Sequence, residues 1–201
     1  MSQENKNQLF SMDEDWKNNA CLHWSHDSIG LYIDGYKEAA DTLVVKVIES
    51  GCGQDTLVYP IAFLYRQYIE LQLKKIIRDS RHLLEDGKGF PENHKIKPLW
   101  DVANGLMKKV IAEIDGSAGE YISQEDLKVI SAIINAFVEV DPESFAFRYP
   151  KDKKGNNNLE GLTHINLRKL GEEINRLSEK LDKFEIVVGM LNEWKSESQY
   201  D

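Results

Sequence analysis

TLVYPIAFLYRQYIELQLKKIIRDS, residues 56–80, is the stretch of sequence that decides the fold. Apolar side chains lie on nearly every side of this stretch, as in a helix at the centre of a bundle. Asp55 or Thr56 can cap the start of the helix, and Pro60 stands near its first turn, where the missing N–H costs least. The stretch therefore predicts a long central helix.

Residues 164–195 show the most regular apolar pattern in the chain. Apolar residues recur there at alternating intervals of three and four, which places them on one continuous helical face. This face can pack along the central helix or against its own copy in a dimer, and packing within the chain is the simpler interpretation. The residues of the face are Leu167, Leu170, Ile174, Leu177, Leu181, Phe184, Val188 and Leu191.

Further helices are predicted around these two. Residues 27–50 carry apolar side chains on one helical face, and Gly51-Cys52-Gly53 is expected to end that helix. Another helix is expected to begin at Pro98, and another to follow Ser123, which starts a capping-box pattern. The fold class that these patterns predict is all-α, an antiparallel helical bundle.

The remaining segments divide the chain into an N-terminal arm and a single domain. Residues 1–26 are polar and mildly acidic, and we expect an arm that docks through its aromatic side chains, whereas residues 27–201 form the helical domain. Residues 141–163 lack a helical period, which predicts a short β-hairpin or an ordered aromatic loop before the last helix. The aromatic residues of the arm are Phe10, Trp16 and Trp24.

The composition indicates a folded, acidic protein. The chain has 201 residues, of which 41% are hydrophobic and 29% charged, so it can bury a core without disulfides or metals. The formal net charge of −9 argues against sequence-blind DNA binding over the whole surface. From Arg66 to Lys109, however, ten Lys and Arg outnumber six Asp and Glu, so either a local basic patch or a mixed-charge surface can form.

Location and cofactors are predicted from the signatures that the sequence lacks. Cys21 and Cys52 have no metal-ligand spacing and are too few for a disulfide framework. No signal peptide and no membrane-spanning run is found, so a cytoplasmic protein that binds no membrane is expected. Because phosphate-binding, dinucleotide-binding and zinc-binding motifs are absent, no cofactor and no metal is predicted. His23 and His26 lie close together without a third ligand nearby.

Arg66 and Glu70 are charged residues that a purely structural central helix would not need. At a spacing of four they project from one face of the helix, inside its apolar stretch, where an unpaired charge is costly. They can form a structural ion pair that fixes the register of the helix. Alternatively, Glu70 can hold Arg66 so that its guanidinium faces a phosphate or another anion.

Two further candidate residues are expected in loops. His94 precedes the predicted helix at Pro98 and can cap that helix, bind an anion or transfer a proton. Arg148 stands among aromatic residues and can stack on a base, clamp a phosphate or simply cover aromatic packing. Tyr149 and Lys151 follow it and are candidate RNA- or nucleotide-binding residues.

Lys74 and Arg78 complete the set of candidate RNA- or nucleotide-binding residues. They belong to a run of cations near the end of the central helix, which also includes Lys75, Arg81 and His82. Such a strip can bind a polyanion. Cations at the C-terminal end of a helix are also favoured by the helix dipole alone.

Three segments of the chain resemble HEPN-domain proteins. YPIAFLYRQYIELQLK at 59–74 resembles their central helix, in which a glutamate follows an arginine four residues later. NHKIKPLW at 93–100 resembles their next segment, a histidine ahead of a leucine-rich helix. DPESFAFRYP at 141–150 resembles a segment in HEPN-like proteins of bacterial defence systems. The resemblance extends from about residue 30 to about residue 190 and concerns the order of elements more than single residues.

The resemblance implies a helical bundle that is often homodimeric. It also implies a metal-independent RNase of a toxin–antitoxin or abortive-infection system, with an antitoxin or another defence protein as partner. The active site of such nucleases resembles an Arg-x4-6-His motif. Here none of the six arginines is followed by a histidine at that spacing, and Arg78 is separated from His82 by only three residues.

Three functional hypotheses follow. The first is an RNase with a composite site, in which His94 transfers protons, Arg66 and Arg148 stabilise charge, and Glu70 orients Arg66. The second, which the missing motif favours, is a non-catalytic HEPN-like module that binds RNA or nucleotides or has a regulatory role. The third is an unrelated helical interaction protein. The first two predict that these four side chains meet in space, whereas the third predicts that they are scattered.

Overall fold

The computed structural model describes residues 8–22, 25, 27–113 and 123–197. These residues form helices and loops without a β-strand, which confirms the predicted all-α bundle. Two 3-10 turns, Gln8–Phe10 and Trp16–Asn18, precede the bundle. Its helices are α1 (Ile29–Ser50), α2 (Gln54–Leu83), α3 (Ile96–Glu113), α4 (Gln124–Val140) and α5 (Leu167–Glu197).

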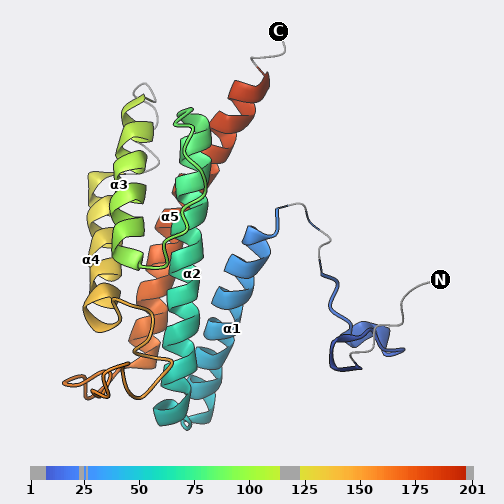
Figure 1. The fold of residues 1–201 in the computed structure, drawn as a ribbon, viewed down its shortest axis with the longest axis vertical. Coiled ribbons are helices and arrows are strands. Elements are labelled where there is room, and N and C mark those ends of the chain that lie inside the picture. Colours follow the sequence, from blue (N-terminus) through green and yellow to red (C-terminus); the bar gives the residue numbers. More distant parts are fainter. Residues whose placement is uncertain (1–7, 23–24, 26, 114–122, 198–201) are drawn as a thin grey trace.

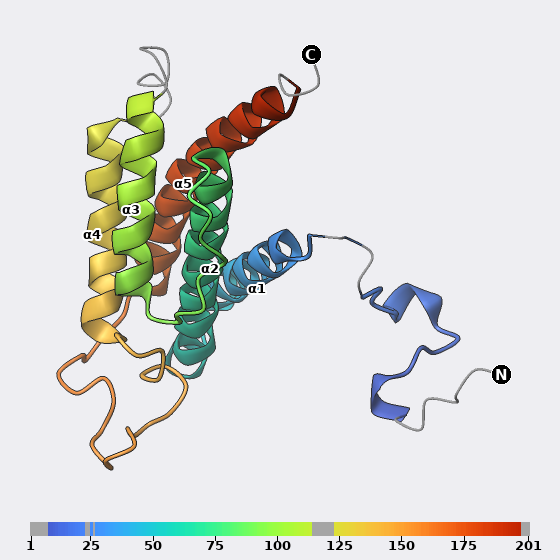
Figure 2. The ribbon, with the colours of Figure 1, turned by 45° about the horizontal axis from the view of Figure 1, so that its top comes forward.

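The central helix of the bundle is α2 (Figure 1). It packs against α1, α3 and α5, and α4 closes the bundle by packing on α3 and α5. Most sequence neighbours are antiparallel, namely α1 with α2, α3 with α4, and α4 with α5 (Figures 1 and 2). In contrast, α2 and α3 run in the same direction, because residues 84–95 return along α2 before α3 begins (Figures 1 and 2).

The ends of the helices follow from local sequence. Gly51 adopts a φ of 65°, a left-handed conformation that ends α1 at little cost, as the sequence predicted. At the start of α4, Ser123 and Asp126 form the predicted capping box, in which each side chain accepts a hydrogen bond from the backbone N–H of the other. Helix α3 begins at Ile96, two residues earlier than predicted, and Pro98 is tolerated in its first turn.

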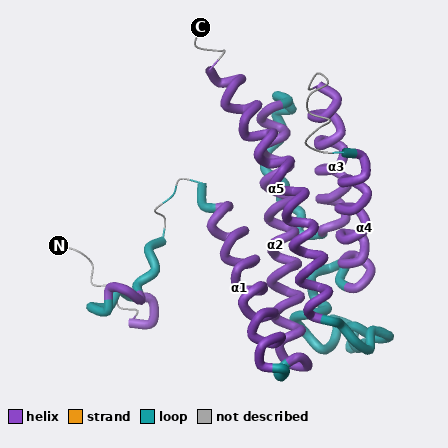
Figure 3. Tube along the Cα trace, turned by 180° about the vertical axis from the view of Figure 1, so that it is seen from behind, coloured by secondary structure: helices purple, strands orange, loops and turns teal. Residues whose placement is uncertain are grey.

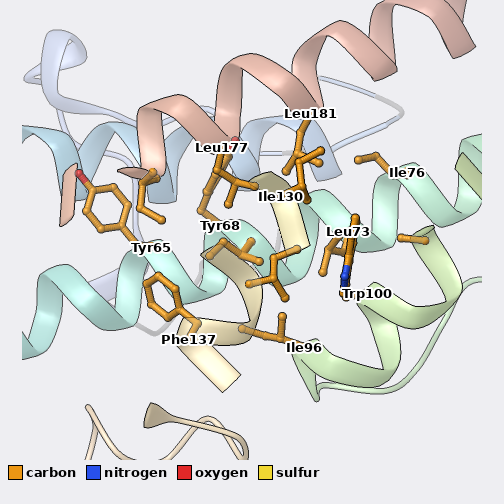
Figure 4. Close-up of a cluster of buried hydrophobic side chains, with 14 of the residues drawn as sticks. Tyr65, Tyr68, Leu73, Ile76, Ile96, Trp100, Ile130, Phe137, Leu177 and Leu181 are labelled. Carbon is orange, nitrogen blue, oxygen red and sulfur yellow. The ribbon is translucent and has the colours of Figure 1, made fainter. Parts of the chain in front are cut away.

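The apolar face of α5 packs within the chain. Leu177 and Leu181 lie against α2 in the core, close to Tyr65, Tyr68 and Leu73 (Figure 4). Of the predicted face, Leu170 and Leu191 are half-buried and the other members are fully buried, which confirms the simpler of the two interpretations. The fully buried members are Leu167, Ile174, Leu177, Leu181, Phe184 and Val188.

The segment between α4 and α5 is an ordered loop rather than a β-hairpin. Its only strand-like pairing is one isolated antiparallel bridge between Lys151 and Asn157. The turn inside the bridge is held by Asp152, whose Oδ1 accepts the backbone N–H groups of Lys154 and Asn156 at 2.8 and 2.9 Å. Side-chain hydrogen bonds of this kind stabilise turns without a strand ladder.

The N-terminal arm lies apart from the bundle, beyond α1 (Figures 1 and 3). Two of the aromatic side chains through which it was expected to dock are exposed, Phe10 to 76% and Trp16 to 65%. The third, Trp24, lies outside the described residues. In this structure Phe10 and Trp16 are therefore not buried against the bundle of their own chain.

Candidate functional site

Three charged side chains form a buried row on α2. Nη1 of Arg66 donates to Oε2 of Glu70 at 2.9 Å, and these side chains are only 0% and 4% exposed. One turn further on, Nζ of Lys74 lies 3.1 Å from Oε1 of Glu70. The three residues share one helical face because they are spaced by four. Glu70 thus lies between two cations inside the bundle.

His94 reaches this row from the loop that returns along α2. Its Nδ1 lies 2.8 Å from Oε1 of Glu70, and its backbone oxygen accepts a hydrogen bond from Nη2 of Arg66 at 2.8 Å. In contrast to its buried partners, the side chain of His94 is 78% exposed. The site therefore combines a buried carboxylate with an imidazole that solvent and ligands can reach.

The charge state of Glu70 determines which nitrogen of His94 is protonated. Burial raises the pKa of Glu70, but hydrogen bonds from His94, Arg66 and Lys74 outweigh burial and hold the pKa below its ordinary value of 4.5. An ionised carboxylate only accepts hydrogen bonds, so Nδ1 of His94 donates in its 2.8 Å contact with Glu70, which is shorter than the 3.5 Å between Nδ1 and Nζ of Lys74. In the neutral ring Nε2 is then the unprotonated nitrogen, which is the form that a general base needs.

Asp141 is a member of this site that the sequence analysis missed. Its Oδ2 lies 3.7 Å from Nε of Arg66, and its Oδ1 accepts the backbone N–H groups of Phe145 and Ala146 at 2.8 and 3.0 Å. Asp141 directly follows the last residue of α4, where the helix dipole disfavours an acidic side chain. That unfavourable position is the sequence signal that could have identified it. Asp141 ties the aromatic loop to Arg66.

Arg148 lies in an aromatic cluster next to this site. Its guanidinium carbon is 4.7 Å from the ring centre of Phe145, 5.5 Å from that of Tyr149 and 5.7 Å from that of Phe63. Phe63 precedes Arg66 by about one turn of α2, so the link between Arg148 and the buried row is indirect. Nε of Arg148 donates to the backbone oxygen of Ser144 at 2.6 Å, but Arg148 takes part in none of the ion pairs found among the described residues, and it is exposed. Its charge is therefore available to an anion.

The predicted basic strip at the end of α2 is neutralised by carboxylates. Arg78 donates to both carboxylate oxygens of Asp27, at 3.0 and 2.8 Å, and to Asp79 at 2.7 Å. Lys75 pairs with Asp79 and with Glu185 at 3.2 and 2.9 Å. The cationic groups of Arg78 and Lys75 are thus committed to partners within the chain.

The other candidate RNA-binding residues occupy different surroundings. Lys74 is 5% exposed and belongs to the buried row, and its Nζ also lies 5.9 Å from the ring centre of Phe90. Tyr149 is 52% exposed beside Arg148, and Lys151 is exposed at the isolated bridge. The structure therefore brings Arg66, Glu70, His94 and Lys74 into direct contact, while the roles assigned to these residues remain predictions.

Comparisons of the chain with protein-family models, curated proteins and solved structures found no match. Across the described residues, no group of three or more His, Cys, Asp or Glu side chains is arranged to hold a metal ion. His23 and His26 lie outside those residues. None of the described helices combines the length and the apolar character needed to cross a membrane.

Proposed function

We propose that the protein is a HEPN-like, metal-independent endoribonuclease in which His94 is the proton-transfer residue. The single observation that carries the proposal is the contact between an exposed imidazole and a buried, ionised carboxylate, His94 with Glu70 at 2.8 Å. A carboxylate that holds Nδ1 fixes the orientation of the ring and stabilises the imidazolium that forms when Nε2 takes up a proton. A histidine with only a surface packing role would not need a carboxylate held by two further cations.

Cleavage of RNA through its own 2′-hydroxyl group suits such a site. Nε2 of His94 accepts the proton of the 2′-hydroxyl group, whose oxygen attacks the adjacent phosphorus atom. The bond from phosphorus to the 5′-oxygen of the next nucleotide breaks, and that oxygen takes up a proton from water, while the imidazolium of His94 returns its proton to the solvent. The products are a 2′,3′-cyclic phosphate and a free 5′-hydroxyl group. Negative charge grows on the phosphate oxygens during attack, so a nearby cation lowers the barrier.

The two arginines have different roles in this proposal. Arg66 is completely buried and engages Glu70, the backbone of His94 and Asp141, so it acts as a positioning residue rather than as a phosphate ligand. Arg148 is exposed among aromatic rings and is the group that would contact a phosphate, with Tyr149 available to stack on a base. The charge-stabilising role, which the sequence suggested for both arginines, is therefore proposed for Arg148 alone.

The partners belong to the proposal through the resemblance, and the location through the predicted absence of a signal peptide and a membrane-spanning run. We propose that the enzyme acts on RNA in the cytoplasm as a homodimer and belongs to a toxin–antitoxin or abortive-infection system. A partner protein of that system, such as an antitoxin, would restrain its activity. No cofactor enters the proposed reaction, because the 2′-hydroxyl group is the nucleophile.

A second candidate is a non-catalytic HEPN-like module that binds RNA or nucleotides. The observation that favours it is the complete burial of Arg66 beside His94, which leaves the exposed imidazole without an exposed arginine in direct contact. In that case the buried row would be structural, and Arg148 with Tyr149 would form the binding surface.

Incubation of the purified protein with a set of labelled RNAs, in the presence of a chelator, distinguishes these functions. The nuclease proposal expects cleavage with 2′,3′-cyclic phosphate ends. Retention of intact RNA in a complex would support the binding module instead. If the protein neither cleaves nor binds any RNA and binds no nucleotide, alone or together with the products of neighbouring genes, both proposals are wrong.

A further inference from the structure

A wide apolar groove lies between α4 and the first half of α5. It encloses about 670 Å³, and Ala62 of the central helix lies at its floor. Its walls are formed by apolar side chains such as Ile133 and Phe137 of α4 and Leu170 and Ile174 of α5. Large apolar hollows of this kind on a protein surface mark binding sites more often than chance.

Two features of the groove suit a helical segment as its occupant. Ala132 and Ala136 line it from α4 with exposed, small side chains, so another backbone can approach closely. Ala132 and Ala136 are one helical turn apart, which matches the spacing of side chains on a docked helix. The groove therefore resembles the kind of surface that accepts the apolar face of an amphipathic segment.

The rim of the groove has a surplus of positive charge. Three cations, Lys128, Lys169 and Arg176, line it together with two acidic residues, Glu125 and Glu173. Lys128 pairs with Glu125 at 3.1 Å, and Arg176 with Glu173 at 3.6 Å. Lys169 takes part in no ion pair among the described residues, so the rim favours an acidic occupant.

The N-terminal arm has the complementary character. Its apolar side chains are exposed, with Met12 at 74% and Trp16 at 65%, and a spacing of four would place both on one face of a helix. Asp13, Glu14 and Asp15 stand between them, against a single cation at Lys17. In this structure only Trp16–Asn18 of this part forms a helical turn, so the apolar face flanked by acidic residues would form when the arm becomes helical on docking.

We propose that the arm, residues 8–22, docks in the α4–α5 groove of a second copy of the chain. The arm lies beyond α1, on the opposite side of the bundle from α4 (Figures 1 and 2), so the groove of a neighbouring copy can receive it without a path around its own bundle. Met12 and Trp16 enter the groove, and the acidic residues between them face its cationic rim. The proposal rests on the homodimer of the proposed function and specifies how that dimer forms, and it does not depend on cleavage of RNA.

Sedimentation of the full-length protein with four sequences tests this exchange of arms. The wild type is expected to sediment as a dimer, whereas Trp16→Asp in the arm and Ala136→Glu in the groove each weaken association about 30-fold or more, as for a buried anchor residue. Met190→Asp is the matched control, because Met190 is exposed to 59% on α5 outside the groove. That variant should dimerise like the wild type. Circular dichroism checks that all variants keep their helical content.

A mixture of the two defective variants provides the decisive observation. The Trp16→Asp chain keeps an intact groove, and the Ala136→Glu chain keeps an intact arm. An equimolar mixture should therefore dimerise more strongly than either variant alone, but less strongly than the wild type. A monomeric wild type, including one whose arm docks on its own groove, would overturn the proposal, as would a mixture that stays monomeric or a dimer that only Met190→Asp disrupts.

Discussion

Nδ1 of His94 lies 2.8 Å from Oε1 of Glu70, although the two residues are 24 positions apart and belong to a loop and a helix. Glu70 is almost completely buried, whereas His94 is mostly exposed. The carboxylate is itself held by Arg66 and Lys74. A titratable ring is thereby fixed at the surface by a charge network inside the bundle. Through this contact the central helix positions a surface histidine in addition to packing the core.

Removal of Arg66 is expected to destabilise the fold strongly. In Arg66→Met, Glu70 and Asp141 keep their buried carboxylates without the guanidinium that lies beside both, which costs about 3–5 kcal/mol of unfolding free energy. Urea denaturation measures the loss. The double variant Arg66→Met/Glu70→Leu should recover part of it, because one of the buried charges is removed as well.

A surface ion pair is the control for this prediction. Lys97 and Asp101 are spaced like Arg66 and Glu70, but their side chains are 47% and 58% exposed. Lys97→Met should change the unfolding free energy by less than about 1 kcal/mol, because solvent screens exposed pairs. Equal losses in Arg66→Met and Lys97→Met would contradict the account of the buried row.

The start of α4 should make stability depend on pH in a narrow acidic range. Hydrogen bonds from Lys180 and from the backbone of Ser123 lower the pKa of Asp126 from 3.8 to about 2. Because its pKa is lower in the folded state, the stabilisation by Asp126 is complete above pH 3.8 and is lost as the pH falls toward 2.

Asp126→Asn tests this dependence. At neutral pH the variant should lose about 1 kcal/mol, since the cap keeps only a neutral side chain. The difference in unfolding free energy between wild type and variant should then shrink between pH 3.8 and pH 2. Thermal unfolding monitored by circular dichroism across this range provides the measurement. A difference that stays constant down to pH 2 would show that the Asp126 carboxylate does not stabilise α4.

Binding of single-stranded RNA should depend on Arg148 and hardly on Arg78. Arg148→Ala removes an exposed cation stacked on aromatic rings and is expected to weaken binding about 10-fold, the effect of one lost stacking or phosphate contact. Arg78→Ala removes a guanidinium already paired with Asp27 and Asp79, so the dissociation constant should change less than 2-fold, or roughly 0.4 kcal/mol. Fluorescence anisotropy at several salt concentrations measures the dissociation constants of both variants. A larger loss of affinity in Arg78→Ala than in Arg148→Ala would assign RNA binding to the basic strip.

The elements of the fold could be predicted because their signals are local. Each signal acts within one or two helical turns. The glycines end α1, the capping box at Ser123 starts α4, and the apolar spacing gives the buried face of α5. The contact between Arg66 and Glu70 is also local, because residues four apart on a helix are neighbours.

The contacts across the site could not be predicted in the same way. His94 meets Glu70 only because residues 84–95 return along α2, and no local pattern specifies the direction of that segment. Likewise, Asp141 reaches Arg66 through the packing of the aromatic loop on α2. The neutralisation of Arg78 depends on Asp27, 51 residues away. The sequence shows which residues carry charge, but only the tertiary fold determines which of these charges are paired.

Comparison of RNA cleavage by His94→Ala and His82→Ala tests the central proposal most directly. Both histidines are exposed, but His82 lies at the end of α2, about three helical turns from Glu70. With a chelator present, the rate for His94→Ala is predicted to fall about 100-fold or more, the usual contribution of a proton-transfer group, while His82→Ala cleaves like the wild type. Equal cleavage rates for wild type, His94→Ala and His82→Ala would contradict the assignment of His94.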